Sequence, residues 1–532
     1  MSRFAASSQG VVTSPHYLAT AAGKAVLEAG GNAIEAALAV GSALCVVYPH
    51  MNSLGGDSFW LLSDGAGNLT GLDGAGPAGL RYSREFYAGQ GISAMPVRGP
   101  HAANTVAGLV AVWGAAHAAS QQRWGGKFSW PELLDRARAY AEEGFACSAS
   151  QGEFLAQKWS ELGDFAGLAE HYAPGGHPPP SGSNFQQPHL AASLRLLQRD
   201  GADSFYRGEL GRRIAHGLAQ AGSLLGTDDL AGFHCKEVTP ITVPYRNGLA
   251  ANMPPPTQGV ASLLILGILN RFDLSRYDHR SADYVHLVVE ATKAAFRLRD
   301  RHVADPDRIP VPVAELLASA HLDRLASELD LSRATPWGPG VGPADTVWFG
   351  VMDARGRAVS AIQSLYHEYG SGIVAGDTGI LWQNRGASFS LHPEHVNTLE
   401  PGKRPFHTLN PAMYLEHGRP RLVYGTMGGD GQPQTQAAVA TRALDYALPL
   451  SEVLDSPRWL LGRTWGNASV SLKLESRFAP EVFDELARRG HEVERVEDYA
   501  QMMGHAGVIR ATGNGHMEAA ADPRSDGSAA GI

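Results

Sequence analysis

The junction between Asp345 and Thr346 has residue types that could cut their own peptide bond. Residues 338–343, just before it, are glycine and proline with a single valine, a composition that holds neither a helix nor a central strand. Residues 347–352, just after it, are apolar except for Gly350, which is typical of a buried strand. A threonine hydroxyl at such a boundary can attack the carbonyl carbon of the preceding residue. Cleavage there would make Thr346 a new N-terminus.

A second apolar stretch follows closely and would complete a β-hairpin. The connecting residues end in Gly356, and three-residue hairpin loops commonly have glycine in the left-handed position. With the loop centred on Arg355, Thr346 lies opposite Ser364, unless a bulge shifts the register by one residue. Opposed residues have Cβ atoms about 4.5–5.5 Å apart, so the two hydroxyls could interact. An ordinary hairpin with a polar start fits the same residues, because threonine is common in strands.

Patterns of helices and strands run throughout the chain on both sides of this hairpin. We expect helices at 33–47, 260–272, 286–302 and 435–446, and strands at 379–382 and 422–425. The first of these helices is apolar almost all round and should be buried, with Asn32 and Glu35 spaced as a capping box. The charged residues of 286–302 are expected on a solvated face. Since there is no repeat and no long linker, one large α/β-type unit is expected rather than two domains.

Composition and charge exclude several classes of function. The 532 residues are 44% apolar and 18% charged with a net charge of −9, and no run rich in lysine or arginine suggests a nucleic-acid partner. The longest apolar run, 36–47, is shorter than the roughly 20 residues that cross a membrane, and the first residues do not resemble a secretory signal. Cys45, Cys147 and Cys235 form no CxxC pair, so we expect free thiols in a reducing cytoplasm.

Two further motifs are relevant to chemistry. His367 and Glu368 begin like a zinc-binding HExxH motif, but Ser371 stands where the second histidine is needed, so we expect no metal and no other cofactor. Gly428 and Gly429 follow an expected strand and precede an expected helix, where their N–H groups would be open to an anion. A tight strand-to-helix turn explains the same glycines equally well.

Several motifs taken together resemble the γ-glutamyltransferase family of N-terminal nucleophile hydrolases. They are Gly30-Gly31-Asn32-Ala33, Pro254-Pro255-Pro256, Gly379-Ile380-Leu381, Pro401-Gly402-Lys403-Arg404-Pro405, Gly428-Gly429 and Asp522-Pro523-Arg524. The likeness covers nearly the whole chain and implies an α+β fold, a four-layer αββα sandwich. It also implies a precursor that cuts itself into a large subunit, 1–345, and a small subunit, 346–532. The two would be intertwined in one structural domain, with further dimerisation left open.

The resemblance implies roles for four of these residues. Thr346 would be the nucleophile and its freed α-amine the general base, since an α-amine has a pKa of about 7.7–8.0. Ser364 would hydrogen-bond the nucleophile. Gly428 and Gly429 would form the oxyanion hole.

The expected substrate pocket departs from the family pattern. Ser388 replaces an acidic residue, Tyr366 replaces an asparagine, and His407 and Thr408 replace a pair of serines. Arg385 stands where the family has an uncharged or acidic residue, and its guanidinium could fork onto a carboxylate. These changes imply a small carboxylate amide without an amino group, held by Arg385, Tyr366, His407 and Thr408.

The reaction expected from this pocket is hydrolysis of a linear amide. Leu72-Asp73 is followed by Gly74 rather than by arginine, so a γ-glutamyl group would lose a further contact. With these substitutions, the chain resembles in particular those members of the family that convert oxamate to oxalate and ammonia in bacterial purine (urate) breakdown. A structural role for His407 is an equal alternative. A γ-glutamyl hydrolase or transferase, or another acylase, is a second hypothesis, and a non-catalytic relative that only binds a small acid is a third.

Overall fold

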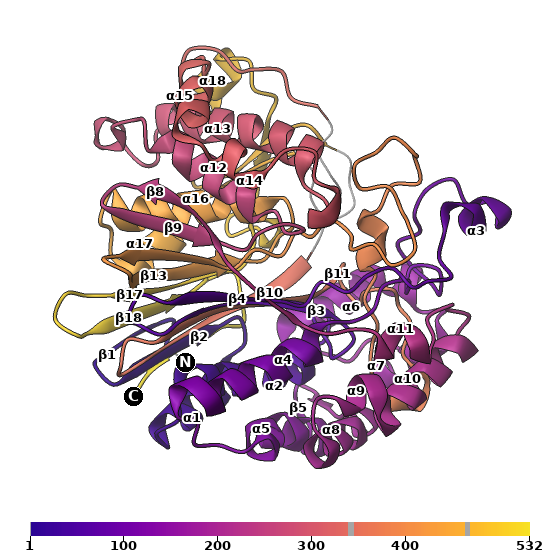
Figure 1. Ribbon diagram of the computed structural model, residues 1–532. Coiled ribbons are helices and arrows are strands. Elements are labelled where there is room, and N and C mark those ends of the chain that lie inside the picture. Colours follow the sequence, from indigo (N-terminus) through magenta and orange to yellow (C-terminus); the bar gives the residue numbers. More distant parts are fainter. Residues whose placement is uncertain (1, 339–344, 463–468) are drawn as a thin grey trace.

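Two antiparallel β-sheets stacked face to face form the centre of the molecule (Figure 1). The structure, a computed structural model, describes residues 2–338, 345–462 and 469–532, so the loop expected at 338–343 lies outside the described residues except for Gly338. Within this part of the chain each sheet has seven strands. Across the first sheet they are β19 (Ser528–Gly531), β2 (Gly10–Ser14), β10 (Asp345–Asp353), β11 (Ala358–Tyr366), β3 (Asp57–Ser63), β4 (Leu69–Asp73) and β7 (Lys236–Val238). Across the second they are β1 (Phe4–Ser7), β18 (Met517–Ala521), β17 (Ala506–Ala511), β13 (Arg419–Thr426), β12 (Ala412–Glu416), β9 (Gly248–Asn252) and β8 (Ile241–Tyr245).

Helices cover the outer face of each sheet, which completes four layers (Figure 1). Below the first sheet lie α1 (Tyr17–Glu28), α2 (Ala33–Val47), α4 (Leu109–Ala119), α5 (Trp130–Glu143), α6 (Ala149–Leu162), α8 (Pro188–Asp200) and α10 (Glu209–Gln220). Above the second lie α12 (Gly259–Leu269), α13 (Ala282–His302), α15 (Ser319–Ser327), α16 (Gly431–Leu444), α17 (Leu450–Asp455) and α18 (Pro480–Arg488). The remaining described elements are α3 (Arg84–Gly89), α7 (Ala166–Tyr172), α9 (Ser204–Arg207), α11 (Thr227–Ala231), α14 (Val313–Leu316), β5 (Phe145–Ala146), β6 (Asn184–Phe185), β14 (Trp459–Leu461), β15 (Leu472–Glu475) and β16 (Val493–Val496). The expected α+β, four-layer αββα sandwich is confirmed.

Three hydrophobic cores separate these layers. One fills the space between the first sheet and its helices, and a second fills the space between the second sheet and its helices. The third lies between the two sheets, where Phe59, Trp348 and Ile362 meet Val423 and Ile509. Side chains alternate along a strand, so residues two apart on β3, β10 and β11 face the same core.

The helix α2 begins at a capping box and is buried along its whole length. Asn32 accepts hydrogen bonds from the N–H groups of Ile34 and Glu35, and the Glu35 carboxylate accepts the N–H of Asn32. This capping box is the one expected, and every residue of the helix is buried, also as expected. No helix within the described residues is long and apolar enough to cross a membrane.

Two expectations are corrected by the structure. The helix at 286–302 exists, but Glu290, Lys293 and Arg299 are buried rather than solvated, because α18 and α16 pack against that helix. Residues 379–382 make only isolated bridges and no strand of a sheet. The helix at 33–47 has the predicted ends, and the helices at 260–272 and 435–446 and the strand at 422–425 are present with ends shifted by a few residues.

Close packing between the two sheets depends on glycine beside Trp348. A Cβ atom built on Gly425 would lie 2.2 Å from Cδ1 of Trp348, and one on Gly507 would lie 2.3 Å from Cζ3. The indole therefore occupies the space that side chains at these two positions would need, and its Nε1 donates to Ser360 Oγ at 3.0 Å.

Substituting Gly425→Ala should lower the free energy of unfolding by about 1–3 kcal/mol, the usual cost of overpacking a core. Urea denaturation followed by tryptophan fluorescence would measure it. Gly513→Ala is the matched control, because a Cβ atom at Gly513 would have no heavy atom of the described residues within 4 Å. Equal midpoints for the two variants would contradict this account of the packing.

Candidate active site

The strands of the two sheets end at the same two ends of the sandwich, so segments far apart in the sequence meet at each end. A Cβ atom on Gly65 would lie 2.8 Å from the carbonyl oxygen of Gly356, and one on Gly418 would lie 3.2 Å from Cα of Gly67. The turns after β3, β10 and β12 therefore lie at one end of the sandwich. The start of β10, with Thr346, must lie at the opposite end, together with the segment that follows β13.

Three polar residues form a row across the first sheet at that end. Ser364 on β11 pairs with Asp57 on β3, and Thr346 lies opposite residues 364–365 of β11. The expected hairpin register holds from Val347 to Met352, and one extra residue on β11 shifts it at Thr346. Each of the three lies two positions along its strand from a residue of the inter-sheet core, namely Trp348, Ile362 and Phe59, so all three face the second sheet.

Thr346 is fully buried, and its hydroxyl has no hydrogen-bond partner among the described residues. On the adjacent strand, Ser364 Oγ accepts the backbone N–H of Tyr366 at 2.7 Å. Tyr366 has a φ of +85°, which is uncommon for a residue with a side chain. Such backbone strain costs of order 1–3 kcal/mol and persists only where the surroundings impose it, here through Ser364 on one side and an arginine on the other.

That arginine is Arg385, a fully buried cation with unused donors. Its guanidinium carbon lies 3.9 Å from the centre of the Tyr366 ring, and Nη1 donates to Thr408 Oγ1 at 3.2 Å. Nε and Nη2 have no partner among the described residues. Burial lowers the pKa of Arg385 to about 10, partly offset by Tyr366 and Asp57, so the side chain is still charged at neutral pH. Buried unpaired donors are costly unless a ligand fills them.

Asp57 and His407 form a buried carboxylate–imidazole pair next to this arginine. His407 Nε2 lies 2.9 Å from Asp57 Oδ2, while Asp57 Oδ1 accepts the N–H of Gly108 at 2.9 Å and Gln383 Nε2 at 3.1 Å. Burial raises the pKa of Asp57 to about 7, against the opposing effect of these donors and of the Arg385 charge. Burial also lowers the pKa of His407 well below its ordinary value, and Arg385 adds to that shift.

A glycine loop closes the site from the second sheet. Gly428 and Gly429 follow β13 with φ of +112° and +52°, and neither N–H donates to another described residue. Gln258 Nε2 fixes this loop by donating 2.8 Å bonds to the carbonyl oxygens of both Gly429 and Thr408. Arg299 Nη1 in turn donates to Gln258 Oε1 at 2.9 Å and to Asp430 Oδ1 at 2.8 Å.

These contacts connect most of the residues expected at the site. From Gly429 they run through Gln258 to Thr408, and from Thr408 through Arg385 and Tyr366 to Ser364, which lies across from Thr346. The residues predicted for catalysis and for substrate binding therefore lie together, and their individual roles stay predictions.

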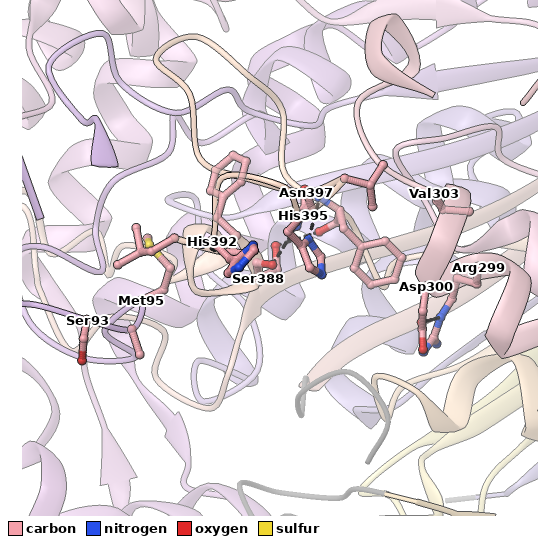
Figure 2. A pocket seen from close by; sticks show the side chains of 15 residues that line it. Ser93, Met95, Arg299, Asp300, Val303, Ser388, His392, His395 and Asn397 are labelled. Atoms are coloured by element: carbon pink, nitrogen blue, oxygen red, sulfur yellow. Dashed lines mark hydrogen bonds and ion pairs between the residues drawn. The ribbon is translucent and has the colours of Figure 1, made fainter. Parts of the chain in front are cut away.

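A cavity of about 550 Å³ lies beside these residues (Figure 2). Arg299 and Asp300 of α13 stand on one side of it, and Ser388, His392, His395 and Asn397 of the 388–397 loop stand on another. Arg299 links the cavity to the glycine loop. The residues that line the cavity do not include Thr346, which lies deeper between the sheets.

One described group of side chains has the residue types of a metal site. Ligand atoms of His286, Glu290 and His491 all lie within 4.8 Å of one another. However, His286 Nδ1 and His491 Nε2 are hydrogen-bonded at 2.8 Å, and Lys293 Nζ lies 2.7 Å from Glu290 Oε1. The group is therefore satisfied by its own hydrogen bonds, and it lies away from Thr346 behind the second sheet.

Sequence reasoning missed Asp57, Gln258 and Arg299. Asp57 follows Gly55-Gly56 at the start of a strand, which is a usable signal for a buried functional carboxylate. Gln258 follows three prolines and Arg299 lies within a charged helix, so neither position stands out before the fold is known.

Comparisons with known proteins agree with this geometry. Residues 19–532 match the family described as gamma-glutamyltranspeptidase. The chain is 50% identical over 99% of both chains to an oxamate amidohydrolase proenzyme of Klebsiella pneumoniae subsp. pneumoniae. It is 31% identical to a glutathione hydrolase proenzyme of Escherichia coli, over 97% of this chain and 90% of that one. The crystal structure of cephalosporin acylase from Bacillus halodurans superposes with a TM-score of 0.91 at 32% identity, over 99% of this chain and 96% of that one.

The αββα sandwich, together with the relatives that share it, defines a self-processing amidohydrolase of the N-terminal nucleophile type. The chain belongs to the γ-glutamyltranspeptidase family, as its residues 19–532 and its relatives show.

Gln258→Leu should lower the free energy of unfolding by about 2–3 kcal/mol, because two buried carbonyl oxygens would lose their donor. Chemical denaturation would measure the loss. Gln198→Leu is the control: Gln198 Nε2 also donates to a carbonyl, that of Pro131, but near the surface. A Gln258 variant as stable as the control would show that the loop is held by something else.

Proposed function

We propose that the chain cuts itself between Asp345 and Thr346 and then hydrolyses a small carboxylate amide, for which oxamate is the best fit. Thr346 Oγ attacks the Asp345 carbonyl, the peptide becomes an ester, and water releases subunits 1–345 and 346–532. The new α-amine then serves as general base for the Thr346 hydroxyl, with a pKa of about 7.7–8.0 near neutrality.

The catalytic cycle follows from the same groups. Thr346 Oγ attacks the amide carbon of the substrate, and the N–H groups of Gly428 and Gly429 stabilise the oxyanion. Ser364 hydrogen-bonds the nucleophile. Ammonia leaves with a proton passed on by the α-amine, and water resolves the acyl-enzyme to release oxalate.

One observation carries the choice of substrate: Arg385 is a fully buried guanidinium whose Nε and Nη2 have no hydrogen-bond partner within the described chain. A carboxylate is the ligand that satisfies two such donors of a guanidinium. Tyr366, His407 and Thr408 surround this cation and leave it no protein carboxylate as a direct partner within the described residues. The 50% identical relative named for oxamate supports the same substrate.

A second candidate is an acylase or γ-glutamyl hydrolase for larger amides. The cavity of about 550 Å³ beside the site favours it, as do the names of the glutathione hydrolase and cephalosporin acylase relatives. Rates of ammonia release from oxamate and of nitroaniline release from γ-glutamyl-p-nitroanilide would separate the two functions.

Oxamate as substrate would place the enzyme in purine breakdown. Three unpaired cysteines support the cytoplasm as its location.

Thr346→Ala should give an uncut chain without activity, because the hydroxyl attacks both the Asp345 carbonyl and the substrate. Thr346→Ser keeps a hydroxyl and should still be cut. Denaturing electrophoresis and mass spectrometry would distinguish one chain from two. A Thr346→Ala protein that is cut at the same bond would refute the assignment of the nucleophile.

Arg385→Met should raise KM for oxamate by about 10- to 150-fold, since a hydrogen bond to a charged group is worth roughly 1.5–3 kcal/mol. Oxamide, which has a second amide in place of the carboxylate, is the matched substrate and should be affected much less. Steady-state kinetics with both compounds would test this. An unchanged KM for oxamate would remove Arg385 from carboxylate binding.

A further inference from the structure

The pair formed by Asp57 and His407 has a feature that the proposed mechanism does not use. His407 Nδ1 is fully buried and has no hydrogen-bond partner among the described residues. It lies on the ring whose other nitrogen contacts Asp57, and Asp57 stands in the same row as Ser364 and Thr346. Adjacent strands are about 4.8 Å apart, so Asp57 lies roughly 10 Å from the nucleophile strand.

The hydrogen bonds of Asp57 determine which ring nitrogen of His407 carries the proton. Gly108 N–H and the Gln383 amide are both donors, so Asp57 Oδ1 must act as an acceptor. Burial raises the pKa of Asp57 to about 7, and the positive charge of Arg385 opposes that rise and so favours the ionised form. The ionised carboxylate can only accept, so His407 beside it donates from Nε2. A neutral imidazole has one proton, and Nδ1 is then a lone-pair acceptor.

The neighbouring unpaired atoms specify the ligand that would use this acceptor. Within the described part of the chain, Nε and Nη2 of Arg385 are donors without a partner, and Nδ1 of His407 is an acceptor without one. The ligand that satisfies all three has a carboxylate next to a group that donates an N–H. An amide of an α-oxo acid such as oxamate has both, whereas the corresponding ester has the carboxylate but no donor.

We propose that Asp57 is a positioning residue that holds His407 with its proton on Nε2, so that Nδ1 accepts a hydrogen bond from the amide N–H of the substrate. The pair thereby selects amides over esters of the same acid, and this selection rests on the proposed function. His407 touches the substrate, and Asp57 acts only through His407.

Asp57→Asn is the informative substitution. Its side-chain oxygen can still accept from Gly108 and Gln383, while its NH₂ group faces His407 Nε2 as a donor. The imidazole must then move its proton to Nδ1, which turns the acceptor for the substrate into a donor. His407→Gln keeps an acceptor in the side chain, and His407→Leu has none.

The experiment compares kcat/KM for oxamate and for monomethyl oxalate, the ester with no N–H, in chains verified to be cut in two. We expect Asp57→Asn and His407→Leu each to lower the oxamate value by about tenfold to a hundredfold, the range for a lost hydrogen bond in a buried site. The ester value should change by less than about threefold, and His407→Gln should retain part of the oxamate activity. Asp353→Asn is the control, since Asp353 is a buried carboxylate bonded to backbone N–H groups and Arg357 at the far end of the same sheet.

Two further results separate this inference from the proposed function. The double variant Asp57→Asn/His407→Leu should lose no more oxamate activity than His407→Leu alone, because Asp57 acts through His407. Equal losses for amide and ester, or additive losses in the double variant, would overturn the inference while leaving oxamate hydrolysis intact. If the wild type does not hydrolyse oxamate, the proposed function fails. In that case ¹⁵N spectra of histidine-labelled protein still test which ring nitrogen of His407 carries the proton. The His407 signal, assigned by its loss in His407→Gln, must show Nδ1 unprotonated, and a protonated Nδ1 refutes the inference.

Discussion

The arrangement of the molecule depends on how closely its two sheets pack. Trp348 lies against Gly425 and Gly507 with no room for a side chain at either position, so strands from both sheets meet in a fixed alignment. The alignment makes the sheets end together. Thr346 stands two residues before Trp348 and Gly428 stands three residues after Gly425, so the same packing brings Thr346 and the glycine loop to one end.

Much of this end could be predicted from local sequence. The hairpin loop at Gly356 determines the register that pairs Val347 with Gln363, since a three-residue turn allows few alternatives. The capping box of Asn32 and Glu35 and the burial of α2 follow in the same way from spacing and composition. The bulge at Thr346 is one of two registers that the sequence allows, and it could not be decided because one extra residue on β11 leaves no mark in the sequence.

The parts that could not be predicted depend on contacts between segments far apart in the chain. Arg299 lies in a helix whose charges suggested a solvated face, yet it is buried between Phe296 and Phe406 and bonded to Gln258 and Asp430. Asp57 meets His407 across 350 residues. Only the fold shows that these groups are neighbours, because a single sequence carries no information on which distant polar residues meet. The resemblance to a family supplied the expected roles of Thr346, Ser364 and the glycines, but it gave no partner for Arg299 or His407.

The strand order bears on how the two pieces of a chain cut before Thr346 would behave. Strands β10, β11 and β19 would come from the small subunit, and β2, β3, β4 and β7 of the same sheet from the large one. The second sheet is likewise mixed, with β12, β13, β17 and β18 beside β1, β8 and β9. Neither piece would contain all the strands of either seven-stranded sheet, so separating the pieces would mean unfolding both. Such a pair would not dissociate on dilution, and its persistence would be governed by an unfolding rate rather than by a binding constant.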